Sequence, residues 1–174
     1  MKRVPKRNLL LLQFERRTIK LKISDIKVYK VKPRWIFVKV LTDEGIAGWG
    51  EMISGTKTET VVAGAYEMGK KLLGRNPFEI ERLWQEMHRS FFRGGPINGT
   101  IISGLEMALW DIKGKALNLP VYELLGGAAR DRIRVYSWIG GDRPSDVAEQ
   151  AQERVDKGFT AIKMNATSEL HYID

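Results

Sequence analysis

The chain has 174 residues, of which 43% are hydrophobic and 29% charged, a composition typical of a globular protein with a buried core. It contains no cysteine, which excludes disulfides and thiolate metal sites and favours a cytoplasmic location. No apolar run approaches the roughly 20 residues of a membrane-spanning helix, so we expect no membrane partner. The net charge of +8 would suit a nucleic-acid-binding protein if it were spread over the fold.

The positive charge is instead concentrated at the N-terminus. The first 20 residues hold seven basic side chains and one acid, so they carry +6 and the other 154 residues carry only +2. We therefore expect no nucleic-acid partner. We interpret residues 1–20 as a non-native basic extension, because Arg16-Arg17 can be encoded by a ribosome-binding sequence and Leu21 by an alternative start codon. A basic arm for RNA or for a membrane surface is the alternative.

Three strands are predicted after this segment. Ile23–Val31 alternates apolar with polar residues, Trp35–Thr42 is rich in β-branched and aromatic residues, and Ile46–Glu51 follows. Between the last two, Thr42-Asp43-Glu44-Gly45 is a turn with glycine where a positive φ is needed. The pattern predicts an antiparallel three-stranded meander.

Helices are predicted next. One covers Thr56–Leu73 and ends at Gly74, and another runs to about Ser90 from a cap at Asn76-Pro77. After a loop at 91–96, a longer helix begins at Ile101.

The helix from Ile101 to Leu119 has the features of a tightly packed element. Gly104 and Gly114 lie inside it, and because each costs roughly 1 kcal/mol relative to alanine, a close neighbour is expected to require them. Asp111 and Lys115 are spaced for a helical ion pair. We interpret the acids of this helix as structural, since nothing in the spacing supports a catalytic role for Glu106 or Asp111. Pro120 can then open a short helix that ends at Gly126-Gly127.

The last part of the chain has a different pattern. A strand at Ile133–Ile139, a helix at Ser145–Lys157 and a strand at Thr160–Met164 form a βαβ unit, which implies parallel strands. The character of the chain therefore changes near Arg130. The alternative is a small self-contained α+β domain whose last strands join the meander.

The long helix and its exit carry the most specific motif. Its residues are Ser103–Glu106, Ala108-Leu109, Asp111-Ile112, Gly114-Lys115, Pro120-Val121 and Leu124–Gly126. They resemble the mandelate racemase/muconate lactonizing branch of the enolase superfamily, with one departure at Ile101, where that family usually has a small residue. Within the branch, the acid-sugar dehydratases are most similar, on four further segments: Pro33–Trp35, Arg93–Pro96, Tyr136–Pro144 and Lys163–Asn165.

The resemblance implies the domain organisation. Residues 21–130 would be an α+β N-terminal cap domain, made of the antiparallel meander and a helical bundle, and residues 131–174 the truncated start of a (β/α) TIM-type barrel. A complete barrel takes about 250 residues, so only its first strand, first helix and second strand would be present. We therefore expect this chain to be an N-terminal fragment.

The resemblance also implies a reaction. The family abstracts the proton next to a carboxylate with the help of Mg²⁺, and its dehydratases then eliminate a β-hydroxyl as water. The expected substrate is a small-molecule sugar acid, an aldonate such as galactonate, and the full-length protein would be a homo-oligomer. The family's Mg²⁺ carboxylates come from later barrel strands, so we expect no metal ligand in this chain and no activity from it alone. The alternatives are a non-catalytic cap or assembly module that needs a separate barrel chain, or another dehydratase or racemase of the family.

Two candidate catalytic residues lie at the end of the last strand. Lys163 and Asn165 point to the same side of that strand, at the edge where barrel enzymes have their active sites. By resemblance they would hold the substrate carboxylate or its enediolate. Racemases and cycloisomerases of the branch tend to have a second lysine where this chain has Asn165, which cannot act as a base. The alternative is an ordinary surface strand end.

Candidate substrate-binding residues lie in the cap domain. In this family two cap loops choose the substrate, and here they would be Lys32–Trp35 and Met52–Thr56. Arg34 would pair with a carboxylate or with hydroxyls, and Trp35 would line the pocket; otherwise they are a solvated arginine and a core tryptophan. Arg93, beside Gly94-Gly95, is a third candidate. The two histidines, His88 and His171, are interpreted as incidental.

Overall fold

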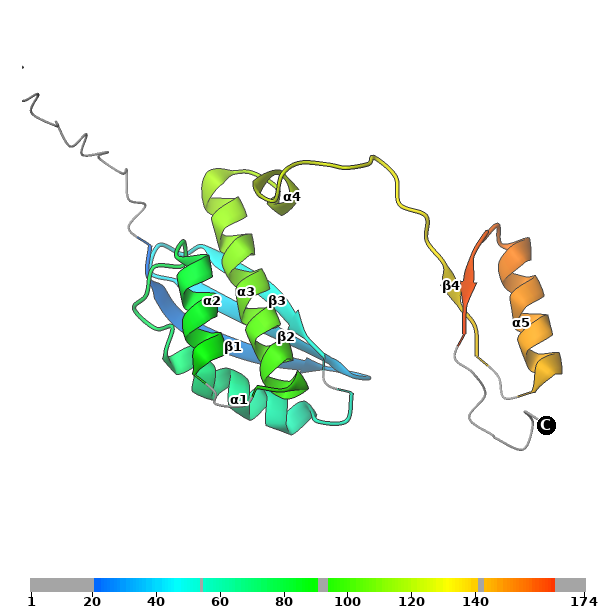
Figure 1. Ribbon diagram of the computed structural model, residues 1–174, viewed down its shortest axis with the longest axis horizontal. Coiled ribbons are helices and arrows are strands. Elements are labelled where there is room, and N and C mark those ends of the chain that lie inside the picture. The colour runs from blue at the N-terminus through cyan, green and yellow to red at the C-terminus, as the bar shows by residue number, and fades with distance from the viewer. Residues whose placement is uncertain (1–20, 54, 91–93, 141–142, 165–174) are drawn as a thin grey trace, which may run out of the picture. The chain divides into compact units, whose positions relative to one another are not determined.

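The computed structural model describes residues 21–53, 55–90, 94–140 and 143–164. These form two compact units that divide between Gly127 and Ala128, and each is described by itself. The first unit contains β1 (Ile23–Val31), β2 (Trp35–Thr42), β3 (Ala47–Met52), α1 (Thr58–Lys70), α2 (Ile80–Arg89), α3 (Pro96–Leu117) and α4 (Val121–Leu124) (Figure 1). The second contains β4 (Ser137–Trp138), α5 (Pro144–Asp156) and β5 (Ile162–Lys163).

The first three strands form the predicted antiparallel meander. They lie in the order β1-β2-β3, and β1 and β2 have the predicted bounds, whereas β3 lies one residue later than predicted. Along β2, every second side chain is buried and those between are half-buried, because one face of the sheet meets the core. The turn between β2 and β3 has Gly45 at φ +81°, where a side chain would be strained.

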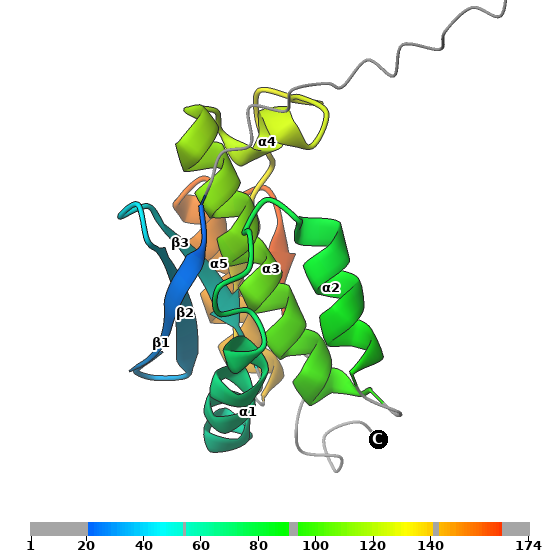
Figure 2. The same ribbon diagram turned by 90° about the vertical axis from the view of Figure 1, so that its left-hand side faces the viewer.

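Helices α1 and α3 pack on one face of this sheet, and α2 packs against α3 (Figure 2). The buried core between sheet and helices is continuous, and its fully buried members include Ile36, Val38, Val40, Met52, Leu83, Leu105, Leu109 and Ile112. This sheet with its helices confirms the predicted α+β class of the first domain.

The helix ends differ from the sequence-based prediction in physically simple ways. The Asn76 side chain accepts a hydrogen bond from the Phe78 N–H at 2.9 Å, so it closes a turn and α2 begins only at Ile80. Helix α3 begins at Pro96, five residues before the predicted start, because proline suits the first turn of a helix. Its end at Asn118 is left-handed, with φ 53°.

Helix α3 and strand β3 approach so closely that side chains do not fit between them. A Cβ atom built on Gly48 would collide with the Ala108 carbonyl, and one on Gly50 with the Gly104 carbonyl. A Cβ on Gly104 would collide with the Met52 side chain. The close neighbour that Gly104 of α3 was expected to require is therefore β3.

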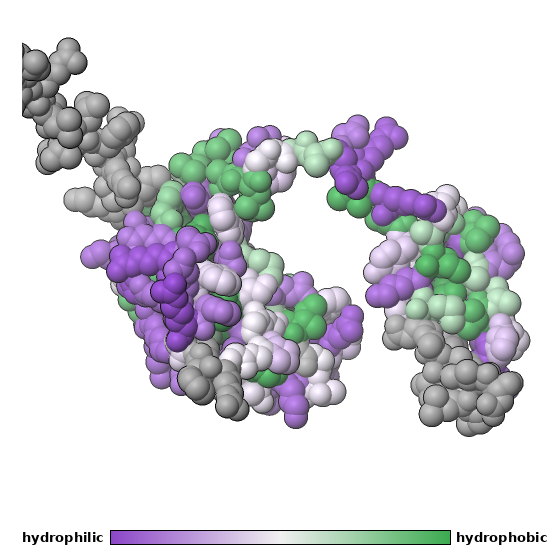
Figure 3. Space-filling view, in the orientation of Figure 1, coloured by the Kyte–Doolittle hydropathy of each residue, from purple (hydrophilic) through white to green (hydrophobic). Residues whose placement is uncertain are grey.

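In the second unit, β4 and β5 pair in parallel, with Ser137 opposite Ile162 and Trp138 opposite Lys163. Their sheet is separate from the meander, so the alternative in which the last strands join the meander is wrong. Both strands are shorter than predicted. The segment before β4 has no strand partner among the described residues, and Ile133 and Val135 are 77% and 64% exposed. Figure 3 shows hydrophobic residues on the surface of this unit.

An ion pair joins the segment after α1 to α2. The Arg75 guanidinium donates to both carboxylate oxygens of Glu86, at 2.7 and 3.0 Å. These hydrogen bonds, with a smaller contribution from Arg82, lower the pKa of Glu86 to about 2.

No helix among the described residues is long and apolar enough to cross a membrane.

The α3–β3 approach predicts that alanine at Gly50 is strongly destabilising. Gly50→Ala should lower the free energy of unfolding by about 3 kcal/mol, since its methyl group meets a backbone carbonyl that cannot move aside. Gly99→Ala is the matched control, because Gly99 lies in α3 with open space around its Cβ position. It should raise the stability by up to about 1 kcal/mol. Urea unfolding measures both, and equal effects of the two substitutions would contradict the close approach.

The Arg75–Glu86 pair predicts a pH dependence of stability. Because the folded-state pKa lies below the ordinary value of 4.5, the stabilisation is fully present above that value and is lost as the pH falls towards 2. Glu86→Gln should therefore lower the Tm at pH 7, and the difference from the unsubstituted chain should shrink between about pH 5 and pH 2. Glu81→Gln is the control on the same helix, since Glu81 accepts from the neutral Gln85. A Tm difference that stays constant over this range would be inconsistent with the pair.

Candidate functional site

The two predicted specificity loops lie at the same end of the first sheet. In the ladder, Val31 pairs with Trp35 and Ile36 pairs with Met52. The hairpin tip at 32–34 and the segment after Met52 therefore lie at the same end of the sheet. The turn that joins β2 and β3 lies at the opposite end. This arrangement follows from the antiparallel order of the strands.

The start of α3 reaches the same end of the sheet. The Ile53 N–H donates to the Thr100 hydroxyl at 2.9 Å, which fixes the first residue after β3 against the first turns of α3. Gly94 and Gly95 lie immediately before this helix. Arg93, the third predicted substrate-binding residue, and Ser54 lie outside the described residues.

Arg34 and Trp35 form the most chemically distinctive pair at this end. The Arg34 guanidinium lies 5.4 Å from the centroid of the Trp35 ring, within the range of a cation–π contact. Arg34 is exposed and Trp35 is half-buried, so Trp35 is not a core tryptophan. A guanidinium held on an aromatic face can still donate to a carboxylate or to hydroxyls. This end is suited to binding a polar anion.

A second candidate site lies at the end of β5. Lys163 is the last residue of that strand, which was predicted to extend to Met164. Its Nζ lies 5.8 Å from the Tyr136 ring centroid and 5.7 Å from that of Trp138. Asn165 lies outside the described residues. Sequence reasoning did not identify Tyr136 and Trp138 as site residues, although their spacing of two already places them on one side of an extended segment.

The acids of α3 have structural partners, as predicted. Asp111 Oδ2 accepts from Lys115 Nζ at 2.6 Å and from the Trp49 N–H at 2.9 Å, while Lys115 also donates to the Ala47 carbonyl at 2.8 Å. Glu106 accepts from the Trp110 indole N–H at 3.3 Å. The ion pair thus ties α3 to the backbone of β3.

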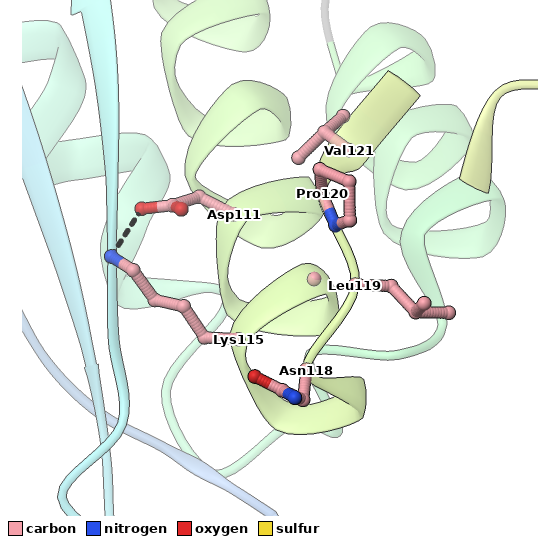
Figure 4. Close-up of a pocket in the computed structure, with 7 residues that line it drawn as sticks. Asp111, Lys115, Asn118, Leu119, Pro120 and Val121 are labelled. Carbon is pink, nitrogen blue, oxygen red and sulfur yellow. Dashed lines mark hydrogen bonds and ion pairs between the residues drawn. The ribbon is translucent and has the colours of Figure 1, made fainter. Parts of the chain in front are cut away.

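A hollow of about 370 Å³ lies beside this ion pair, at the end of α3 (Figure 4). It is lined by Asp111, Gly114, Lys115, Asn118, Leu119, Pro120 and Val121. Its two charged side chains bond to each other and to β3. We therefore do not assign a ligand to it.

The described residues do not form a metal site. Nowhere in the described part of the chain do three side chains of the types His, Cys, Asp and Glu come together. His88 stacks on Trp84, with ring centroids 4.9 Å apart, which supports a structural role, and His171 lies outside the described residues. A divalent cation such as Mg²⁺, which prefers carboxylate oxygens, finds no suitable ligand set here.

The chain is similar to known proteins along most of its length. A family model described as the N-terminal domain of mandelate racemase/muconate lactonizing enzyme matches residues 15–126; the match begins within the predicted N-terminal extension. D-galactonate dehydratases of Variovorax paradoxus and Verminephrobacter eiseniae are 50% and 49% identical to it over 155 residues. That alignment covers 88% of this chain but only 41% of theirs, so the chain spans about two fifths of these relatives.

Solved structures of enolase-superfamily proteins are also similar to this chain. An enolase from Pantoea ananatis with bound D-gluconate and Mg is 34% identical, with a TM-score of 0.76, over 84% of this chain and 37% of that one. A member of the enolase superfamily from Salmonella Typhimurium is also 34% identical, with a TM-score of 0.75, over 83% and 42%.

Proposed function

This chain belongs to the mandelate racemase/muconate lactonizing enzyme family of the enolase superfamily, and we propose that it is part of an acid-sugar dehydratase that acts on D-galactonate. The observation that carries this proposal is the 50% identity to a D-galactonate dehydratase over 88% of the chain. The exposed Arg34 on the half-buried Trp35 of the cap and the lysine at the end of β5 are consistent with an anionic, hydroxyl-rich substrate.

In the proposed reaction an aldonate loses the proton next to its carboxylate together with its β-hydroxyl. The products are a 2-keto-3-deoxy acid and one molecule of water. Lys163 is assigned to the substrate carboxylate because its ammonium is a point charge at a strand end, with Asn165 proposed beside it. Arg34, Trp35 and Arg93 are assigned to the sugar chain, where they would select the substrate.

Mg²⁺ is bound in the D-gluconate complex of the Pantoea relative, and we propose that the dehydratase also needs it. The described residues offer no fitting ligand set, so the proposal assigns no metal ligand and no metal-dependent step to them. The ion would be bound by other residues of the complete enzyme.

One observation supports a second role, that of an assembly module that pairs with a separate barrel chain. The second unit exposes apolar side chains that a larger barrel would cover, among them Val155 and Ile162, which are 56% and 43% exposed. Exposed parallel strands readily pair with further strands. The dehydratase role and the assembly role involve the same substrate. They differ in whether the barrel belongs to the same polypeptide as this chain or to a separate one.

A chimera tests the proposed reaction. Residues 21–164 of this chain, joined to the remainder of the Variovorax paradoxus D-galactonate dehydratase, should convert D-galactonate to its 2-keto-3-deoxy acid, measured as the semicarbazone. The remainder alone should be inactive. A folded chimera that dehydrates D-gluconate but not D-galactonate would contradict the assigned substrate. If the two parts are also active as separate, co-expressed chains, the assembly role is supported.

Substitution of Arg34 tests the assignment of the cap. In the chimera, Arg34→Gln should raise the KM for D-galactonate by roughly 10- to 100-fold, the value of one or two hydrogen bonds to a charged donor. Arg82→Gln is the control, because Arg82 pairs with Glu79 and Glu86 on α2. An unchanged KM for Arg34→Gln would refute the role of Arg34 in substrate binding.

A further inference from the structure

One face of the β4–β5 sheet carries a lysine whose ammonium lies near two aromatic rings. Trp138 and Lys163 are register partners, so their side chains share a face, and Tyr136 lies two residues before Trp138 on the same side. The next residue, Ile139, is fully buried, and the Gln150 side chain of α5 bonds to both the N–H and the carbonyl of Gly140. The lysine and the rings therefore lie on the face opposite to Ile139.

The contact with two rings distinguishes Lys163 from an ordinary surface lysine. Both ring centroids are less than 6 Å from Nζ, the range in which a ring quadrupole attracts a cation. An aromatic ring of this kind attracts the charge without using the three N–H donors of the ammonium. The Lys163 carbonyl accepts from the Ile139 N–H at 2.9 Å, but the Lys163 ammonium has no hydrogen-bond or ion-pair partner among the described residues, so none of them occupies those donors.

The rings also restrict the lysine side chain before any ligand arrives. Ordering a free lysine side chain on binding costs rotamer entropy, and part of that cost is removed when the side chain is ordered in advance. Both rings lie within 6 Å of the Lys163 ammonium, and Tyr136 and Trp138 are themselves 56% and 48% exposed.

We propose that Tyr136 and Trp138 are positioning residues that hold the Lys163 ammonium at the end of β5 for the carboxylate of an acid-sugar substrate. The identity of the carboxylate rests on the proposed function. The placement of the ammonium near both rings does not depend on that function, and it can be measured separately.

The placement is tested by NMR on the 174-residue chain with ¹³C-methylated lysines. Ring currents should move the Lys163 signal, identified by its loss in Lys163→Arg, upfield of the other lysines. Trp138→Leu and Tyr136→Leu should each move it back, whereas Trp138→Phe should retain most of the shift. Trp49→Leu is the matched control, because Trp49 lies 5.1 Å from Lys39 Nζ and should change that lysine only. A Lys163 signal that is unshifted, or that is unchanged by both leucine substitutions, would overturn the proposal.

The positioning role is tested by kinetics in the chimera. Trp138→Leu should raise the KM for D-galactonate about 3- to 10-fold, with little change of kcat, and the increase should largely disappear in a Lys163→Gln background. An equal increase in both backgrounds would show that the ring acts independently of Lys163, against the proposal. If the ring-current shifts are present but the chimera does not use D-galactonate, the placement stands and the proposed substrate fails.

Discussion

The contact between α3 and β3 is the constraint on which the cap depends. This contact leaves no room for side chains at Gly48 and Gly50. Hydrogen bonds join the helix to the strand at both ends of the contact. Lys115 and Asp111 bond the backbone of β3 at its start, and Thr100 bonds Ile53 just past its end. The helix therefore runs antiparallel to the strand. The six residue steps of strand from Ala47 to Ile53 span roughly 20 Å. The fifteen steps of helix from Thr100 to Lys115 span a similar length, roughly 22 Å.

This fixed helix explains how the cap presents its loops. The antiparallel ladder brings the tip of the first hairpin and the C-terminal end of β3 to the same end of the sheet, and α3 begins at that end. The loops therefore belong to a rigid scaffold although they lie on its surface, which is common for binding residues. Asp111 of α3, by contrast, is occupied in holding the helix to β3. The proposed recognition at the loops and the stability at the helix would thus be supplied by different residues.

Much of the first unit could be predicted because its patterns are local. Burial of one sheet face gives the alternation of β1 and β2, and glycines inside a helix indicate a close neighbour. The first turn of α3 was missed because Gly99 and Asn98 are weak helix formers. The β4 strand was predicted too long because β-branched Ile133 and Val135 need a partner strand that the described residues do not supply. The aromatic contacts of Lys163 depend on the register between segments 25 residues apart, which no local pattern shows. The substrate-site roles of Arg34, Trp35, Arg93, Lys163 and Asn165 all stay predictions, and Arg93 and Asn165 also lie outside the described residues.

We propose that this chain supplies substrate recognition, whereas the metal-dependent step needs residues other than those described. The most direct measurement is an assay of the 174-residue chain alone, with Mg²⁺ and D-galactonate, for the 2-keto-3-deoxy product. Circular dichroism should first establish that the sample is folded. The account predicts no product above the enzyme-free blank. Mg²⁺-dependent turnover by the chain alone would contradict it.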